Sequence, residues 1–292
     1  MQRNISVIGC GKLGASLVAV LAKQGHRVVG VDVVEAHVTA LNAGHAPVQE
    51  TNLESEISAN AERISATMDT AAAVAETDVT FVIVPTPSDE EGCFSAQYAK
   101  SAFEAIGRGV ANKDTYHLVV LISTVLPGTM RYVLAPAIEE ASGRTIGKDF
   151  GLCYSPAFIA LGSIIHNLLN PDFLLVGQSD DRAGETLQSV YRDVVANDAQ
   201  VARMTWENAE LTKICVNTYV TTKIAFANML ADMCDRLPGG DVDVVSGALG
   251  MDRRIGRRYL TGGLGYGGPC FPRDNRALTW IADRLGADVG LA

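Results

Sequence analysis

The chain has 292 residues, enough for one large or two modest domains, and its formal net charge of −9 argues against nucleic acid or an anionic membrane surface as the main partner. The first residues show no basic and apolar leader, and no apolar stretch reaches the length of a bilayer. Its six cysteines form no C-x-x-C pair and its five histidines lack metal-ligand spacing, so we expect reduced thiols, no bound metal and a cytoplasmic location.

The first predicted element is a buried strand at residues 4–8, which runs directly into a glycine motif. A helical pattern follows the motif and stops at Gly25. Gly9 would permit a tight turn, Gly11 would let a pyrophosphate approach bare backbone, and Gly14 would let the helix pack closely on the strand. This spacing between a strand and a helix predicts a dinucleotide-binding site.

A second strand, predicted at residues 27–32, ends in Asp32. A carboxylate at this position accepts hydrogen bonds from ribose hydroxyls and repels a 2′-phosphate, so we expect NAD rather than NADP. The helix N-terminus would offer N–H groups to the phosphates. The residues expected to bind the cofactor here are Gly9, Cys10, Gly11, Lys12, Leu13, Gly14 and Asp32.

Two further apolar runs, at residues 79–84 and 117–122, are typical of parallel strands that are covered on both faces. Each is followed by a hydroxyl side chain, Thr86 and Thr124, at the sheet edge where ligands bind in such folds. Turn formation or helix capping is an equally good reading of either threonine. Strands at 150–154 and 173–176 and a helix at 183–194 complete a Rossmann-like α/β domain with a mostly parallel sheet, expected over residues 1–204.

Residues 206–235 contain no Gly or Pro and predict one long helix, which opens an all-α domain expected over 205–292. Lys213 and Asn217 lie four residues apart and therefore on one face of this helix. Such a pair stabilises a developing alkoxide, although a solvated helix face is the alternative. The helix carries more apolar side chains than one face of a monomer needs, which favours burial against a partner chain.

A shorter helix at 242–249 leads to a glycine-rich loop that contains Cys270. Pro269 and Pro272 stiffen the loop around the thiol, and Asp274 follows four residues later. An isolated cysteine is more often a small buried hydrophobic residue. Its place in this loop, after a nicotinamide-binding fold, instead predicts covalent redox chemistry at carbon.

Together these motifs resemble the UDP-glucose/GDP-mannose dehydrogenase family from residue 3 to about 285. The resemblance implies an NAD-dependent enzyme that oxidises the primary alcohol of a nucleotide sugar to a carboxylate in two steps, through a thiohemiacetal and a thioester. It rests on Gly9-x-Gly11-x-x-Gly14, Val84-Pro-Thr-Pro87, Ser123-Thr-Val125, Ala209-Glu-Leu-Thr-Lys213 with Asn217, Arg254-Ile-Gly256, and Gly267-Gly-Pro-Cys-Phe-Pro-Arg-Asp274.

The resemblance also implies roles for single residues. Cys270 is the expected nucleophile, Lys213 and Asn217 stabilise oxyanions, and Asp274 and Thr124 hold or activate water. In a homodimer, one further arginine reaches the substrate of the neighbouring subunit. The implied substrate contacts are Lys213, Asn217, Arg254, Gly265, Tyr266 and Gly267, with Arg254 as the arginine that acts in the neighbouring subunit, and Thr86 and Thr124 are implied to contact the cofactor.

The chain departs from the family pattern in three places. Ala157 and Leu161 stand where glutamates that assist thioester hydrolysis are usual, and His37 stands where a Lys or Arg is common. The sequence given ends at Ala292, within a connecting helix expected to begin near Asn275 and before the domain that binds the nucleotide. Two alternatives therefore stay open: a shortened relative that oxidises a smaller alcohol, and a catalytically impaired NAD-binding dimer.

Overall fold

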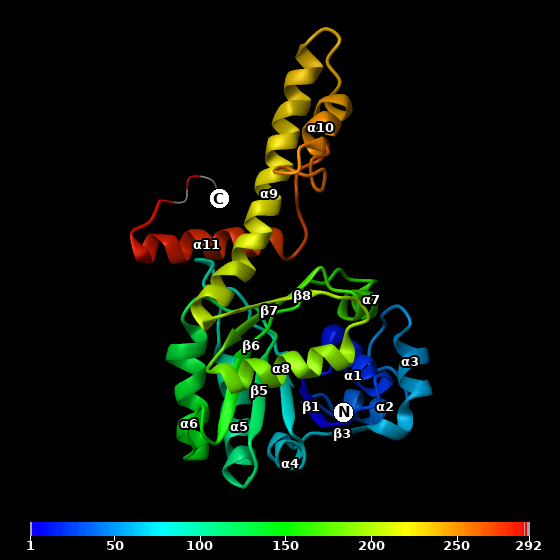
Figure 1. Ribbon diagram of the computed structural model, residues 1–292, viewed down its shortest axis with the longest axis vertical. Coiled ribbons are helices and arrows are strands. Elements are labelled where there is room, and N and C mark those ends of the chain that lie inside the picture. Colours follow the sequence, from blue (N-terminus) through cyan, green and yellow to red (C-terminus); the bar gives the residue numbers. More distant parts are fainter. Residues whose placement is uncertain (1, 289, 291–292) are drawn as a thin grey trace. The chain divides into compact units, whose positions relative to one another are not determined.

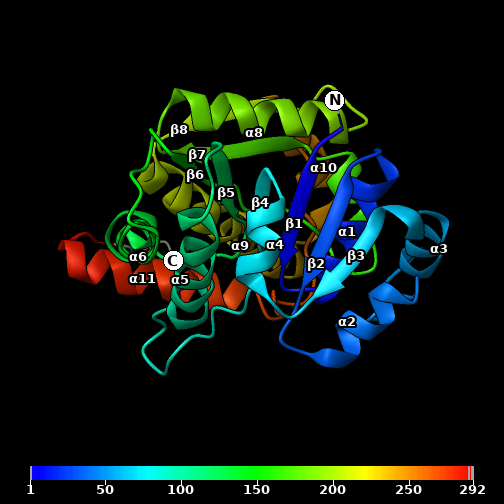
Figure 2. The same cartoon turned by 90° about the horizontal axis from the view of Figure 1, so that it is seen from below.

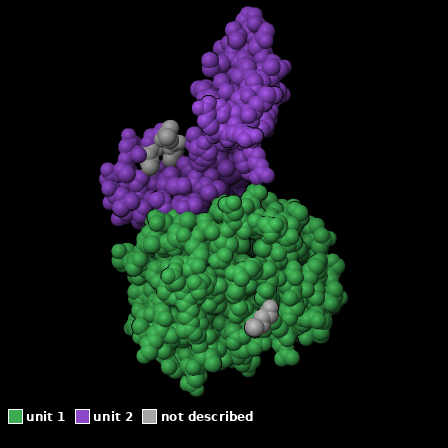
Figure 3. All heavy atoms as spheres, in the orientation of Figure 1, with its two compact units in different colours: residues 1–87, 95–210 green, residues 88–94, 211–292 purple. Residues whose placement is uncertain are grey.

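The computed structural model describes residues 2–288 and 290 and divides the chain into two compact units (Figure 3). Unit 1 consists of Met1–Pro87 and Ser95–Glu210, and unit 2 of Ser88–Phe94 and Leu211–Ala292. The domain boundary expected between residues 204 and 205 stays a prediction.

Unit 1 is built on a sheet to which the described residues contribute eight strands, in the order β3-β2-β1-β4-β5-β6-β7-β8 (Figure 1). All neighbouring strands run parallel except β6 and β7, which are antiparallel. The predicted α/β class with a mostly parallel sheet is therefore confirmed. The strands are β1 (Asn4–Ile8), β2 (Arg27–Val31), β3 (Ile64–Thr67), β4 (Val79–Val82), β5 (His117–Leu121), β6 (Phe150–Tyr154), β7 (Phe173–Gln178) and β8 (Gln200–Met204).

Helices cover both faces of this sheet (Figures 1 and 2). One hydrophobic cluster joins the sheet to α1, α3, α7 and α8, and a second joins it to α4, α5 and α6. A short π-helical segment, Met130–Leu134, leads into α6. The helices are α1 (Lys12–Lys23), α2 (Glu35–Asn42), α3 (Leu53–Ala59), α4 (Thr70–Glu76), α5 (Gln97–Ala111), α6 (Ala135–Ser142), α7 (Ile164–Leu169) and α8 (Asp181–Val194).

Burial on both faces explains the unbroken apolar runs of the central strands. In β5, Leu118 and Val120 join the first cluster, whereas Val119 and Leu121 join the second. Successive side chains of a strand point to opposite faces, so each of these residues needs an apolar environment. This is why β5 was predictable from its sequence to within one residue.

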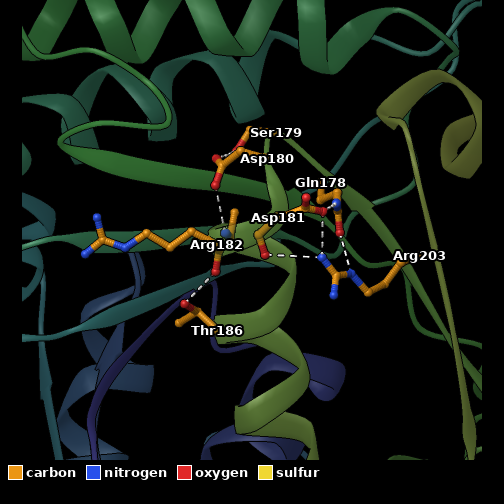
Figure 4. Close-up of polar contacts among 8 residues, drawn as sticks. Gln178, Ser179, Asp180, Asp181, Arg182, Thr186 and Arg203 are labelled. Atoms are coloured by element: carbon orange, nitrogen blue, oxygen red, sulfur yellow. Dashed lines mark hydrogen bonds and ion pairs between the residues drawn. The ribbon is translucent and has the colours of Figure 1, made fainter.

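The two edge strands, β3 and β8, have too few apolar residues to be predicted from the sequence. Polar contacts secure β8 (Figure 4): the Arg203 guanidinium donates to Gln178 Oε1 at 2.6 Å and to Asp181 Oδ1 at 3.1 Å. Asp180 caps α8 by accepting from the backbone N–H of Ala183 at 3.0 Å. Hydrogen bonds therefore compensate at this edge for the burial that the inner strands have.

Unit 2 is helical and contains most of α9 (Trp206–Arg236), together with α10 (Val242–Met251) and α11 (Phe271–Leu285). The expected helix near Asn275 begins four residues earlier, at Phe271, because Pro272 fits the first turn of a helix. It ends at Leu285, where Gly286 adopts φ +66°, so the expectation that this helix continues to the end of the chain is wrong.

Candidate active site

A cleft of about 510 Å³ opens in unit 1 beside the carboxyl ends of β1 and β4. The strand order reverses between these two strands, and ligands bind at such a reversal in open α/β sheets. Residues that follow β1, β2 and β4 line the cleft. Among the predicted cofactor residues, those that line it are Gly9, Gly11, Lys12, Leu13, Gly14 and Asp32.

The three motif glycines have different surroundings. Gly9 adopts φ +91°, which favours glycine, and a Cβ at Gly14 would overlap the Gly9 carbonyl oxygen. A Cβ at Gly11 would meet nothing within 4 Å. Gly9 and Gly14 are thus needed for the turn and the packing, and Gly11 borders open space beside the N-terminus of α1. This space suits the pyrophosphate of a dinucleotide.

Three donors surround the Asp32 carboxylate. The backbone N–H groups of Cys10 and Val34 donate to it at 2.7 and 2.9 Å, and His37 Nδ1 lies 3.1 Å from Oδ2. Burial alone would raise the pKa of Asp32, but these hydrogen bonds outweigh burial and lower it. The carboxylate is therefore ionised and oriented before a ribose arrives.

The Cys10 side chain does not line the cleft. It is fully buried, its Sγ lies 3.6 Å from the carbonyl oxygen of Val31, and burial raises the pKa of the thiol to about 12. Residues that sequence reasoning missed also line the cleft, and two of them, Met68 and Thr70, follow the unpredicted strand β3. Val33 and Val34, which follow β2, are two more.

Hydrogen bonds join the turns that follow β4 and β5. The Ser123 hydroxyl donates to the Val84 carbonyl at 2.7 Å and accepts from the Val84 N–H at 2.9 Å. The Thr86 hydroxyl donates to the carbonyl of Thr124 at 2.8 Å. Thr86 is buried and does not line the cleft, which favours its turn-forming alternative. Thr124 is half-buried, and its role in catalysis stays a prediction.

Glu210 anchors the segment that follows Thr124. It is fully buried, and its carboxylate accepts from the N–H groups of Gly128 at 2.6 Å and Met130 at 2.8 Å. Burial raises the pKa of Glu210 to about 7, although these two hydrogen bonds oppose the rise. The sequence motif contains Glu210, but its spacing does not reveal that this carboxylate caps another helical segment.

In unit 2, Cys270 is exposed and immediately precedes α11. Its carbonyl accepts from the N–H of Asp274 at 2.9 Å, which fixes the first turn of the helix. The Asp274 carboxylate is buried and accepts from Asn217 Nδ2 at 2.6 Å. Asn217 of α9 is therefore joined to the first turn of α11, four residues after Cys270.

Lys213 lies within electrostatic reach of the same residues. Burial and the nearby Arg273 guanidinium lower the pKa of Lys213, and the charges of Asp274 and Cys270 oppose this. Burial raises the pKa of Asp274, against the hydrogen bond from Asn217 and the charges of Lys213 and Arg273. Lys213 and Asn217 are both half-buried, so they do not form a fully solvated helix face.

The predicted substrate loop is held by residues that sequence reasoning missed. The buried Asn275 side chain donates to the Tyr266 hydroxyl and to Thr221 Oγ1, each at 3.1 Å. A Cβ at Gly265 or Gly267 would meet nothing within 4 Å, so the backbone there is open to a ligand.

Arg254 is 88% exposed and forms an ion pair with Asp252 at 2.6 Å. Among residues 2–288 and 290, no group of three or more His, Cys, Asp or Glu side chains is arranged to hold a metal ion. No helix in this described part of the chain is long and apolar enough to cross a membrane.

Both parts of the chain match domains of one known protein family. Residues 3–195 match the NAD binding domain of the UDP-glucose/GDP-mannose dehydrogenase family, and residues 207–292 match its central domain. The chain belongs to this family. NAD is accordingly the cofactor of the first domain, as the sequence predicts, and the open cradle at Gly11 and the ionised Asp32 fit it.

Similar proteins cover nearly the whole chain. The UDP-glucose 6-dehydrogenase of Haloferax volcanii is 38% identical over 99% of this chain and 67% of its own length. The GDP-mannose 6-dehydrogenase of Pseudomonas aeruginosa is 34% identical over 98% and 65%. The structure of a UDP-glucose dehydrogenase from Pyrobaculum islandicum matches with a TM-score of 0.90 and 36% identity, over 100% of this chain and 66% of that one. The chain thus spans about two thirds of the length of its relatives.

Proposed function

We propose that the protein catalyses NAD-dependent oxidation of the primary alcohol of a nucleotide sugar to a carboxylate. The observation that carries this proposal is the group formed in unit 2 by Cys270, Lys213, Asn217 and Asp274. A thiol, a half-buried cation and an amide donor are groups that suit covalent oxidation of an aldehyde. Membership of the family and the names of the relatives support it.

Bound NAD would accept a hydride in each of the two oxidations. The chain's own part in binding is to orient the cofactor. The Asp32 carboxylate would accept from the ribose hydroxyls, and the N-terminus of α1 would hold the pyrophosphate beside Gly11.

The thiol chemistry follows from the four residues of unit 2. The Cys270 thiolate adds to the carbon of the aldehyde, a C–S bond forms, and the carbonyl oxygen becomes an oxyanion. The Asn217 amide donates to this oxyanion, and the Lys213 ammonium neutralises its charge. Loss of a hydride from the same carbon leaves a thioester, which water cleaves to a carboxylate and the free thiol. We assign the water to Asp274 and Thr124.

The test is NADH formation by the chain with UDP-glucose, GDP-mannose and UDP-N-acetylhexosamines, combined with mass spectrometry of Cys270. We expect two NADH per substrate molecule and an acyl adduct on Cys270 that Cys270→Ser abolishes. A chain that binds NAD but makes no NADH with any of these alcohols would contradict the proposal.

A second candidate function is an NAD-binding dimer with impaired turnover. Ala157 favours it, because this side chain packs against the apolar cluster of unit 1 and cannot polarise water. Leu161, which is 65% exposed, is equally inert. An acyl adduct that persists for minutes would indicate this function. A smaller alcohol as substrate is the remaining alternative, and the same NADH assay with simple primary alcohols tests it.

We also propose a homodimer and a cytoplasmic location. Large apolar side chains are exposed along α9, which suits burial against a second copy of the chain. They are Tyr219, Phe226, Met229 and Met233. Sedimentation analysis of the chain tests the dimer.

A further inference from the structure

The segment Ser88–Phe94 belongs to unit 2, with which it is coloured in Figure 3, and it closes on itself as a short loop. The Asp89 carboxylate accepts from the N–H groups of Glu91 at 3.0 Å and Cys93 at 2.8 Å. The Asp89 N–H donates to the Cys93 carbonyl at 3.0 Å, and Ser88 pairs with Phe94 in a single bridge. The loop therefore has a defined conformation of its own.

Two arginines of helix α11, Arg273 and Arg276, contact this loop. Arg276 donates through its guanidinium to the Glu90 carbonyl, and a Cβ at Gly92 would approach Arg276 Cβ to 3.0 Å. The Arg273 guanidinium carbon lies 4.0 Å from the centre of the Phe94 ring, and Phe94 is 6% exposed. A cation at this distance over a ring face is attracted by the electrons of the ring.

Arg273 also belongs to the surroundings of the thiol. It lies three residues after Cys270 in the first turn of α11 and directly precedes Asp274. Its positive charge lowers the pKa of Lys213 and, against the effect of burial, that of Asp274. One guanidinium therefore contacts a buried ring on one side and acts electrostatically on two proposed active-site residues.

We propose that Arg273 is a positioning residue of the thiol chemistry, held in place by the ring of Phe94. The proposal rests on the proposed function and adds to it a residue and a loop. An arginine side chain has many rotamers, and stacking on a rigid ring selects one of them. The ring thereby fixes a positive charge that acts on Lys213 and Asp274, and it holds the first turn of α11 in place.

The same helix provides a matched control. The Arg284 guanidinium carbon lies 4.1 Å from the Trp280 ring, a contact of the same kind near the other end of α11. Arg284→Met and Trp280→Ala therefore remove an equivalent contact from a place where we assign no active-site residue.

The first test measures alkylation of Cys270 by iodoacetamide in the full chain, read by mass spectrometry. We expect Arg273→Met to slow it about threefold at neutral pH, the effect of losing one cation–π contact, because the turn of α11 that follows the thiol is then no longer anchored to Phe94. Phe94→Ala should slow it equally, the double variant should be no slower, and Phe94→Tyr should restore the rate. The Arg284 and Trp280 variants should match the unaltered chain.

The second test measures NADH formation against pH. Removing the guanidinium in Arg273→Met raises the pKa of both Lys213 and Asp274, so we expect both limbs of the profile to move to higher pH. Arg273→Lys, which keeps the charge, should move them less. The maximal rate should fall while the KM for NAD stays constant. Thermal unfolding of each variant separates these effects from loss of folding.

The outcomes distinguish the two proposals. Normal alkylation and an unshifted pH profile in folded Arg273→Met and Phe94→Ala would overturn the role of Arg273 and leave the proposed function intact. Effects that add in the double variant, or that the Arg284→Met control reproduces, would also overturn it. Absence of NADH with the expected alkylation pattern would overturn the proposed function but support the positioning of the thiol by Arg273.

Discussion

Asp32 carries its negative charge at the cofactor cleft because three donors surround it. The backbone N–H groups of Cys10 and Val34 and the ring of His37 hold both carboxylate oxygens. Two of these donors come from backbone that the motif and the following turn fix. Orientation of the carboxylate therefore does not depend on the lysine or arginine that is usual at the position of His37.

We predict that Asp32→Asn weakens NAD binding about tenfold, the effect of losing one charge-assisted hydrogen bond. The same change removes the repulsion of a 2′-phosphate, so affinity for NADP should rise. Calorimetric titration with both cofactors measures this. Asp78→Asn is the control, since the Asp78 carboxylate accepts from the Asn4 N–H at the opposite end of the strands. Equal loss of both cofactors in Asp32→Asn would contradict the prediction.

We predict that Ala157→Glu shortens the lifetime of the acyl adduct on Cys270. Ala157 is half-buried on the apolar cluster of unit 1. The resemblance to the family implies that a carboxylate at this position would act as the general base that the alanine lacks. General bases contribute about a hundredfold or more to such steps. Quenched-flow mass spectrometry gives the lifetime, and Ala157→Gln controls for size without charge. An unchanged lifetime would show that this residue does not limit deacylation.

At the scale of elements, Glu210 joins α9 to the helical segment that begins at Met130. Its two hydrogen bonds replace the N-terminal cap that this segment otherwise lacks within its own sequence. The carboxylate is buried and its pKa is raised, so it is ionised only at a cost in stability.

The pH dependence of stability follows from this pKa. The folded value of about 7 lies above the ordinary value of 4.5, so the contribution of Glu210 is complete below pH 4.5 and is lost as the pH rises towards 7. Between these limits it should lower the free energy of unfolding by roughly 1.4 kcal/mol per pH unit. We expect Glu210→Gln to remove this slope in urea unfolding at pH 5, 6 and 7. Glu139→Gln is the control, because the Glu139 carboxylate also accepts a hydrogen bond from a backbone N–H group, that of Ile146.

Local sequence patterns predicted two kinds of element: strands that are apolar because both faces are buried, and helices that no Gly or Pro interrupts. The strand at Asn4–Ile8 and the helix Trp206–Arg236 lie where their patterns indicate. The edge strand Gln200–Met204 was missed because contacts to residues distant in the sequence stabilise it. The same applies to the site: the Lys213 and Asn217 pair follows from helical spacing, whereas the support of Tyr266 by Asn275 depends on packing that no local pattern contains.

At the scale of the whole molecule, we predict that Arg254 acts in the site of a partner copy. Cys270→Ser and Arg254→Ala should each be inactive alone. Mixing them after dissociation should restore about a quarter of the normal NADH rate, because half of the dimers are mixed and each mixed dimer has one complete site. The control is a mixture of Arg254→Ala with the double variant Cys270→Ser/Arg254→Ala, which should stay inactive because no subunit supplies the arginine. An inactive first mixture would contradict a shared site.

The loop Ser88–Phe94 limits where the domains of this protein can be exchanged with those of a relative. The chain passes between the two units three times, after Pro87, after Phe94 and after Glu210. A chimaera with a single junction near residue 210 therefore takes α11 and the loop from different parents. Arg273 and Arg276 of α11 contact this loop. Chimaeras with a central domain from another family member should need both segments from the same parent, or matching residues at Phe94 and Arg273.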